Sequence, residues 1–195
     1  SMRARIEAMR ALAYVTAAAQ DNAHNNPDEA ARKQGQAFAD LMIPVVKGWS
    51  TESAIDIASL GVQVHGGMGF IEETGAAQHL RDARITTIYE GTTAIQANDL
   101  IGRKIAREKG VTIKGVIAEM RAAATLLDGD LAGIGMRQSA AVDALERAVF
   151  WIVDNFSSDP KAAHVGAVPF LHLLGIVAGA AAAAEQLDHT IRTPE

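Results

Sequence analysis

The sequence contains no cysteine among its 195 residues. Disulfide bonds and thiolate metal sites are therefore excluded, and a cytoplasmic location is the default expectation. Long basic runs are also absent and the formal net charge is −5, which argues against nucleic acid as a partner. The six histidines show no HxxxH or HxxH spacing, so no metal site is predicted.

Aromatic residues are scarce at 5%, whereas hydrophobic residues make up 49% and alanine is very frequent. Alanine is the strongest helix former, and small side chains allow helices to approach each other closely. An all-α fold is therefore predicted, and the length suits one or two small domains. The residue pattern changes near Gly110, which predicts helical domains over residues 1–109 and 110–195.

One stretch near the C-terminus lacks formal charge entirely. No Asp, Glu, Lys or Arg lies between Lys161 and Glu185, and a helix of that length could cross a bilayer. The stretch is mostly alanine and glycine and contains His164, Pro169 and His172, which insert poorly into membranes. A buried helix of a helical bundle is predicted, with no membrane partner.

Hydrophobic periodicity and turn residues indicate where helices begin and end. Pro44 is expected to kink or break the second helix, and the glycines after His65 to end its continuation. Residues 84–91 are expected to form an ordered loop. The face of the second helix predicted to be buried comprises Ala31, Gln34, Phe38 and Leu41. One expected helix begins near residue 50 and ends at the glycines. The other expected helices are 2–20, 27–44, 75–83, 93–109, 112–128, 136–156 and 161–190.

Two loops carry the candidate chemistry. Residues 65–69, His-Gly-Gly-Met-Gly, offer unhindered backbone to a ligand, although a chain reversal with a glycine cap would have the same composition. This is no dinucleotide-binding fingerprint, because no strand precedes it and the spacing differs. Glu90 precedes Gly91 and a threonine-capped helix. Its carboxylate is either a partner of the helix dipole or a general base.

Together these loops resemble the C-terminal helical domain of acyl-CoA dehydrogenases. The resemblance extends over roughly residues 2–109 and is greatest to a bacterial branch that includes enzymes similar to 3-methylmercaptopropionyl-CoA dehydrogenase. That branch carries an additional C-terminal helical domain, which residues 110–195 resemble in part. The segments that agree in order, type and spacing are 63–70, 80–84, 88–92 and 95–96.

The resemblance implies FAD-dependent oxidation of an acyl-CoA thioester to the trans-2-enoyl-CoA. Glu90 matches the catalytic glutamate that removes the α-proton while the β-hydrogen leaves as hydride to the flavin. In the family, the backbone N–H of that glutamate and a flavin hydroxyl bind the thioester carbonyl, which stabilises the developing enolate. Gly91 matches a position that contacts the substrate.

Positions that match FAD contacts form two groups. Those matching contacts to the FAD of the same active site are Thr92, Thr93 and Ala94. Those matching contacts to the adenosine part of a neighbouring subunit's FAD are Gln63, Val64, His65, Gly66 and Gly67. Ala94 departs from the family, in which a polar residue is frequent there. The second group implies a homo-oligomer.

The resemblance also implies a longer protein, because the family's N-terminal helical and middle β-domains supply most flavin and CoA contacts. The 195 residues alone are expected to bind FAD weakly or not at all and to be inactive. Electron-transfer flavoprotein is the expected electron acceptor, and the acyl group cannot be identified from these residues. Two alternatives stay open, namely an acyl-CoA oxidase and a non-catalytic helical oligomerisation module.

Overall fold

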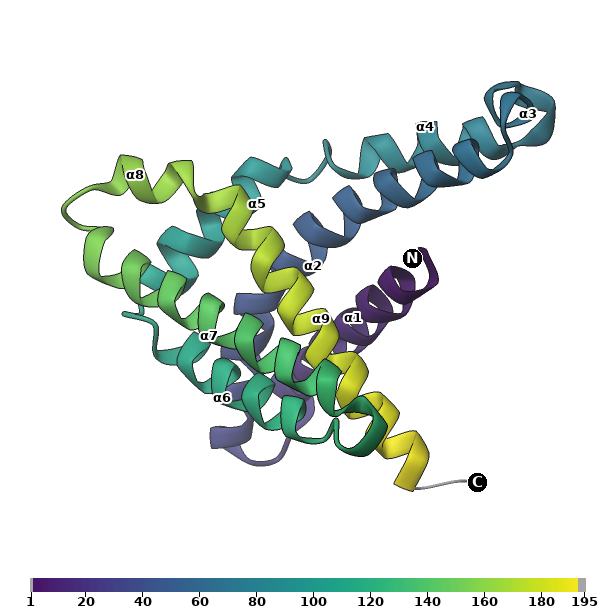
Figure 1. The fold of residues 1–195 in the computed structure, drawn as a ribbon. Helices are drawn as coiled ribbons and strands as arrows, with labels where there is room; N and C mark the ends of the chain where they lie inside the picture. Colours follow the sequence, from purple (N-terminus) through teal and green to yellow (C-terminus); the bar gives the residue numbers. More distant parts are fainter. Residues whose placement is uncertain (1, 193–195) are drawn as a thin grey trace.

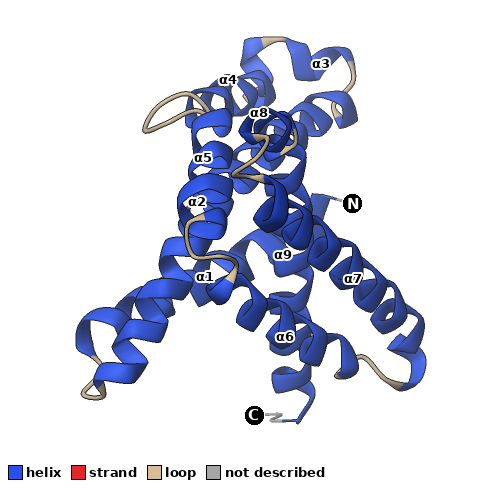
Figure 2. Cartoon of the chain, turned by 90° about the vertical axis from the view of Figure 1, so that its left-hand side faces the viewer, coloured by secondary structure: helices blue, strands red, loops and turns tan. Residues whose placement is uncertain are grey.

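The computed structural model describes residues 2–192, which form helices joined by short connections, with no strand in this range (Figure 2). The all-α prediction is confirmed. The α-helices are α1 (Met2–Asn25), α2 (Glu29–Val64), α3 (Gly67–Phe70), α4 (Ala76–Thr86), α5 (Thr93–Asp99), α6 (Val111–Thr125), α7 (Ala132–Asn155), α8 (Pro160–Val165) and α9 (Ala167–Arg192). Shorter helical turns cover Glu72–Thr74 and Gly129–Leu131, and a π-helical segment, Leu100–Ala106, continues α5.

Helix α9 runs diagonally across the molecule and packs against α1, α2, α5, α6 and α7 (Figure 1). Its Leu171 and Leu174 are completely buried in an apolar cluster that also contains Leu41, Ile101 and Leu145. By length and composition α9 could cross a membrane, but most of its apolar stretch is covered by the rest of the protein. This burial agrees with the predicted core helix.

Helix α2 is continuous through Pro44, so the break that the sequence allowed there does not occur. Pro44 and Trp49 are both buried, and α2 packs against α1, α5 and α9. This packing offsets the roughly 3 kcal/mol that a proline costs in a helix interior. The helix also begins later than predicted, because Asp28 is its N-cap and accepts hydrogen bonds from the N–H groups of Ala30 and Ala31 at 3.2 Å each.

Several other predicted boundaries were displaced. Helix α1 continues to Asn25 instead of ending at residue 20, and α4 continues to Thr86, which shortens the predicted loop 84–91. The predicted helix 161–190 is two helices that meet at Gly166. On α2, Leu41 is buried as predicted, whereas Gln34 is exposed beside an open cavity.

The second half of α2 and the antiparallel α4 project from the body of the molecule as an arm, with α3 at its tip (Figure 1). We call residues 53–86 the arm. The chain turns at the tip through Gly66, and it leaves the base of the arm through residues 87–92 before entering α5. The two loops selected from the sequence therefore lie at opposite ends of one projecting helix pair.

Candidate functional site

Glu90 lies in a strained turn at the base of the arm. It has a φ of 54°, and Gly91 follows with a φ of 92°. A non-glycine residue in this left-handed region costs about 1–2 kcal/mol, and such strain is found disproportionately at functional sites. The Glu90 side chain is exposed to solvent. The fold therefore presents this carboxylate outward on a backbone conformation that glutamate does not favour.

Side chains from two helices hold the backbone of this turn. Lys47 Nζ, from α2, donates a hydrogen bond to the Gly91 carbonyl oxygen at 2.5 Å. Gln96 Nε2, from α5, donates to the Glu90 carbonyl oxygen at 3.1 Å. Both carbonyls of the strained pair are thus engaged, and the Glu90 carboxylate remains free of any recorded hydrogen bond. The arrangement fixes the main chain and leaves the acidic group available.

The start of α5 is tied to α2 as well. Thr93 is 8% exposed, and its hydroxyl donates to Glu52 Oε1 at 2.5 Å. Thr92 occupies the N-cap position of α5 without a side-chain cap bond, and both Thr92 and Ala94 are exposed. Of the three predicted flavin-contacting residues, Thr93 therefore has its side chain committed to the protein interior, and the other two face outward.

Sequence reasoning assigned no role to the side chains that support the turn. Lys47 and Glu52 are more than 40 residues from their partners, so no local motif connects them. Gln96 belonged to a segment that carried the family resemblance, but no contact was predicted for it. A polar face on α2 aimed at the turn is visible only when the helices are packed.

At the tip of the arm, α2 ends at Val64 and His65 takes the C-cap position. The N–H groups of His65 and Gly66 donate to the carbonyls of Gly61 and Gln63 at 3.3 and 3.1 Å. Gly66 has a φ of 62°, which is the conformation that glycine adopts without penalty. The predicted chain reversal at the glycines is therefore present.

The glycines of this cluster have different surroundings. A Cβ atom on Gly69 would lie 2.3 Å from the Val62 carbonyl oxygen, so Gly69 is required for packing. A Cβ on Gly66 or Gly67 would meet no atom within 4 Å. The backbone at these two residues is consequently open to an approaching group, while the glycine at 69 serves the fold alone.

The structure does not bring the two groups of predicted site residues together. They are separated by the arm, in which α4 alone has 11 residues and spans roughly 16 Å at 1.5 Å per residue. Residues 63–67 lie at the tip and residues 90–94 at the base (Figure 1). Within one chain, the two loops could not contact the same end of a ligand.

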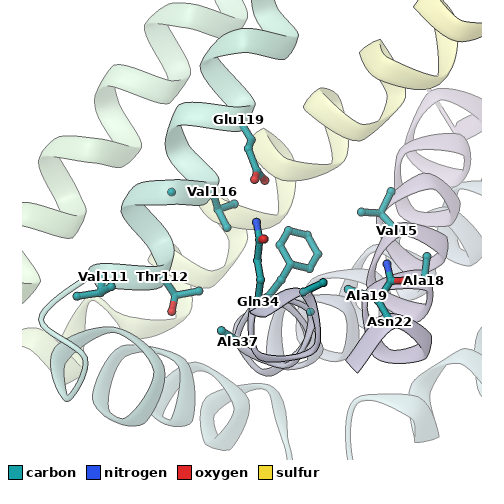
Figure 3. A pocket seen from close by; sticks show the side chains of 14 residues that line it. Val15, Ala18, Ala19, Asn22, Gln34, Ala37, Val111, Thr112, Val116 and Glu119 are labelled. Atoms are coloured by element: carbon teal, nitrogen blue, oxygen red, sulfur yellow. The ribbon is translucent and has the colours of Figure 1, made fainter. Parts of the chain in front are cut away.

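A cavity of about 630 Å³ lies elsewhere, between α1, α2 and α6 (Figure 3). Its wall includes Val15, Gln34, Val116 and Glu119 and contains none of the predicted site residues. A second hollow, of about 530 Å³, lies on the arm and is lined in part by Val62 and Phe70, beside the glycine cluster. Cavity size alone therefore does not mark the turn that carries Glu90.

Two protein families match this helical chain over most of its length. The family described as "Acyl-CoA dehydrogenase, C-terminal domain" matches residues 1–105. A second, described as "Acetyl-CoA dehydrogenase C-terminal like", matches residues 113–192. The chain belongs to the acyl-CoA dehydrogenase family.

Individual relatives agree with this assignment. The chain is 50% identical over 181 residues to 3-methylmercaptopropionyl-CoA dehydrogenase of Ruegeria pomeroyi, an alignment that covers 91% of this chain and 30% of that protein. It is 40% identical to the broad-specificity linear acyl-CoA dehydrogenase FadE5 of Mycobacterium tuberculosis, over 62% of this chain and 20% of the relative. It is 34% identical to the caffeyl-CoA reductase-Etf complex subunit CarC of Acetobacterium woodii, over 49% of this chain and 22% of the relative. The chain thus spans less than a third of each of these relatives.

Proposed function

We propose that the protein containing this chain is an acyl-CoA dehydrogenase and that Glu90 is its general base. One observation supports this role above the others, namely that the Glu90 carboxylate is exposed on a strained backbone held at Glu90 and Gly91 by other helices. A carboxylate that served only a helix cap would not need positive φ. Because the backbone is held in this way, the Glu90 side chain projects from a fixed position toward the α-proton that it would remove.

The same turn provides a place for the thioester. The backbone N–H of Glu90 would donate to the thioester carbonyl, which stabilises negative charge as the α-proton is removed. Gly91, which directly follows the base, would contact the substrate. The base then holds the abstracted proton at its carboxylate. The substrate class is an acyl-CoA thioester.

FAD would supply the hydride acceptor at this site. The residues available to hold it fit that role in different ways. Thr92 and Ala94 are exposed at the start of α5 and would contact it directly. Thr93 would contribute through its backbone, since its hydroxyl is bonded to Glu52. The methyl side chain of Ala94 offers no hydrogen bond, so packing is its contribution.

The tip of the arm would serve a different copy of the protein. Gln63, Val64, His65, Gly66 and Gly67 would hold the adenosine part of a neighbouring subunit's FAD. The open backbone at the glycines and the length of the arm that separates them from Glu90 both favour this division. A homo-oligomer is part of the proposal, because the tip has no role without a neighbour.

We also infer a division of the chain into domains of residues 1–109 and 110–195. The two family matches end at residue 105 and begin at residue 113, which supports a boundary between them. The apolar cluster nevertheless includes residues from both sides, such as Leu41 and Leu145. The proposed domains therefore share one apolar core and are not separated by a flexible linker.

For the isolated 195 residues we propose weak or absent flavin binding and no turnover, in a cytoplasmic protein. Electron-transfer flavoprotein is the proposed acceptor of the complete enzyme, and the CarC relative is named as part of an Etf complex. A fluorescence titration of this chain with FAD tests the first statement. Saturable stoichiometric binding at micromolar concentration would contradict it.

The activity is tested with the full-length protein, purified with its flavin. Incubation with acyl-CoA and an electron acceptor should yield the trans-2-enoyl-CoA, identified by mass spectrometry. Product formation that depends on electron-transfer flavoprotein supports the dehydrogenase. Product formation with stoichiometric peroxide and oxygen consumption would indicate an oxidase, and absence of product with every acyl-CoA would contradict both.

A further inference from the structure

Lys47 interacts with both neighbours of Glu90. Its ammonium nitrogen lies 2.5 Å from the carbonyl oxygen of Gly91, which follows Glu90. The same nitrogen lies 5.9 Å from the ring centroid of Tyr89, which precedes it. Lys47 is half-buried in the middle of α2, 44 residues before Gly91. The ammonium group of Lys47 therefore lies near the residues that precede and follow Glu90.

The helix that carries Lys47 is itself well anchored. Trp49, two residues later, is 5% exposed in the apolar core. Thr51 adds a hydrogen bond from its hydroxyl to the Lys47 carbonyl oxygen at 2.6 Å. The lysine stem therefore begins from a rigid element, which suits a side chain that has to position a loop.

We propose that Lys47 is a positioning residue for the general base and sets the direction in which the Glu90 carboxylate projects. The proposal rests on the function proposed above for Glu90. A charge-assisted hydrogen bond fixes the Gly91 peptide more firmly than a neutral one, and cation–π attraction draws the Tyr89 ring to the same point. With both neighbours restrained, the strained φ of Glu90 is maintained without any bond to its carboxylate.

Gln96 completes the restraint from the opposite side. It donates to the Glu90 carbonyl, and a Cβ atom on Gly91 would lie 2.9 Å from Gln96 Nε2. Gly91 is therefore needed for its positive φ and for the approach of this amide. Lysine is suited to the other side, because its long stem reaches the Gly91 carbonyl from α2 and ends in a charged donor. Methionine has a similar length but cannot donate.

The first experiment uses this chain and does not depend on activity. Hydrogen exchange is measured at the amides of Tyr89 and Gln96, which donate to the carbonyls of Ile85 and Thr92 on either side of the turn. Lys47→Met should accelerate exchange at these amides by about tenfold, because the turn opens more often. Lys47→Arg should remain near wild type, since it retains a charged donor.

Lys33→Met is the matched control, because Lys33 lies on the same helix and makes only an exposed pair with Glu29. It should leave exchange at the turn unchanged. If Lys47→Met does not fold, Lys47→Gln gives the same comparison with a polar side chain. Wild-type exchange in a folded Lys47→Met or Lys47→Gln variant would overturn the proposal.

The second experiment uses the full-length protein with its flavin. Lys47→Met should lower kcat by about tenfold to a hundredfold with little change in KM or flavin content, because a displaced base loses rate more than binding. Lys47→Arg should recover much of the loss. An unchanged kcat would overturn the positioning role. If the wild-type protein has no dehydrogenase activity, the proposed function fails, while the exchange data still decide whether Lys47 restrains the turn.

Discussion

Trp49 of α2 lies directly on the backbone of α9 at Gly175, where a Cβ atom would stand 2.3 Å from the indole Cγ. One turn later, a Cβ on Gly179 would stand 2.7 Å from Cη2 of the same ring. The ring therefore fills a groove that exists only because both residues are glycine. Gly175→Ala should lower the free energy of unfolding by about 1–3 kcal/mol through overpacking, as measured by urea denaturation.

Gly115 provides the matched control for this substitution. It lies within α6, and a Cβ there would meet no atom within 4 Å. Gly115→Ala should raise the free energy of unfolding by about 0.5–1 kcal/mol through helix propensity alone. Equal effects of the two substitutions would contradict the close packing of α2 on α9.

The hydrogen bond from Thr93 to Glu52 joins the start of α5 to α2. Thr93→Val keeps the shape of the side chain and removes the donor, which leaves a half-buried carboxylate with one partner fewer. A loss of about 1–2 kcal/mol in the free energy of unfolding is expected. Thr92→Val is the control, because the exposed Thr92 makes no side-chain cap bond. A loss at residue 92 equal to that at residue 93 would show that the bond does not stabilise the fold.

The left-handed backbone of Glu90 predicts a conflict between stability and function. Glu90→Gly removes the Cβ strain and should stabilise the isolated chain by roughly 0.5 kcal/mol, after the entropy that glycine adds to the unfolded state. Lys109→Gly should act in the same direction, since Lys109 has a φ of 53°. Thermal denaturation measures both. A clear decrease in stability for Glu90→Gly would show that the turn is not strained.

The Glu119–Glu185 pair should make stability depend on pH. Partial burial, and then the charge of Glu119, raise the pKa of Glu185 above its ordinary value of 4.5. The folded state thus binds this proton more tightly, so the contribution of Glu185 to stability is fully present below pH 4.5 and is lost as pH rises through the folded pKa. Glu185→Gln should therefore stabilise the chain at pH 7.

The size of this effect is limited because Glu185 is only partly buried and stays accessible to solvent, so screening leaves about 0.5 kcal/mol or less. The difference between Glu185→Gln and wild type should disappear at pH 4. Glu119→Gln should also stabilise the chain at pH 7, because it removes the repulsion. A wild-type advantage at pH 7 over both variants would contradict this account.

The helical class, the chain reversal at Gly66 and the end of a helix near Gly110 could be predicted from sequence because they depend on local chemistry. Alanine content, periodicity and glycines with positive φ act over a few residues. The break expected at Pro44 does not occur, for the opposite reason. Its local cost is real, but the packing of α2 against α1, α5 and α9 offsets it, and this packing is not encoded near the proline.

The candidate site likewise contains features set by local sequence and features set by packing between distant segments. Glu90 and its glycine could be selected from sequence because a distinctive set of residue types stands together there. Lys47 and Glu52 could not, because their partners lie 44 and 41 residues away and the contacts exist only once α2 and α5 have packed. The hydrogen bond from Thr93 to Glu52 could not be predicted for the same reason.

The most direct measurement is the rate at which substrate bleaches the flavin of the full-length protein under anaerobic conditions, for wild type and Glu90→Gln. The amide keeps the shape of the side chain but cannot accept the α-proton at neutral pH. The bleaching rate should fall by about 10²–10⁴-fold, with flavin content unchanged. Bleaching by Glu90→Gln at a rate near that of wild type would contradict the assignment of Glu90 as the base.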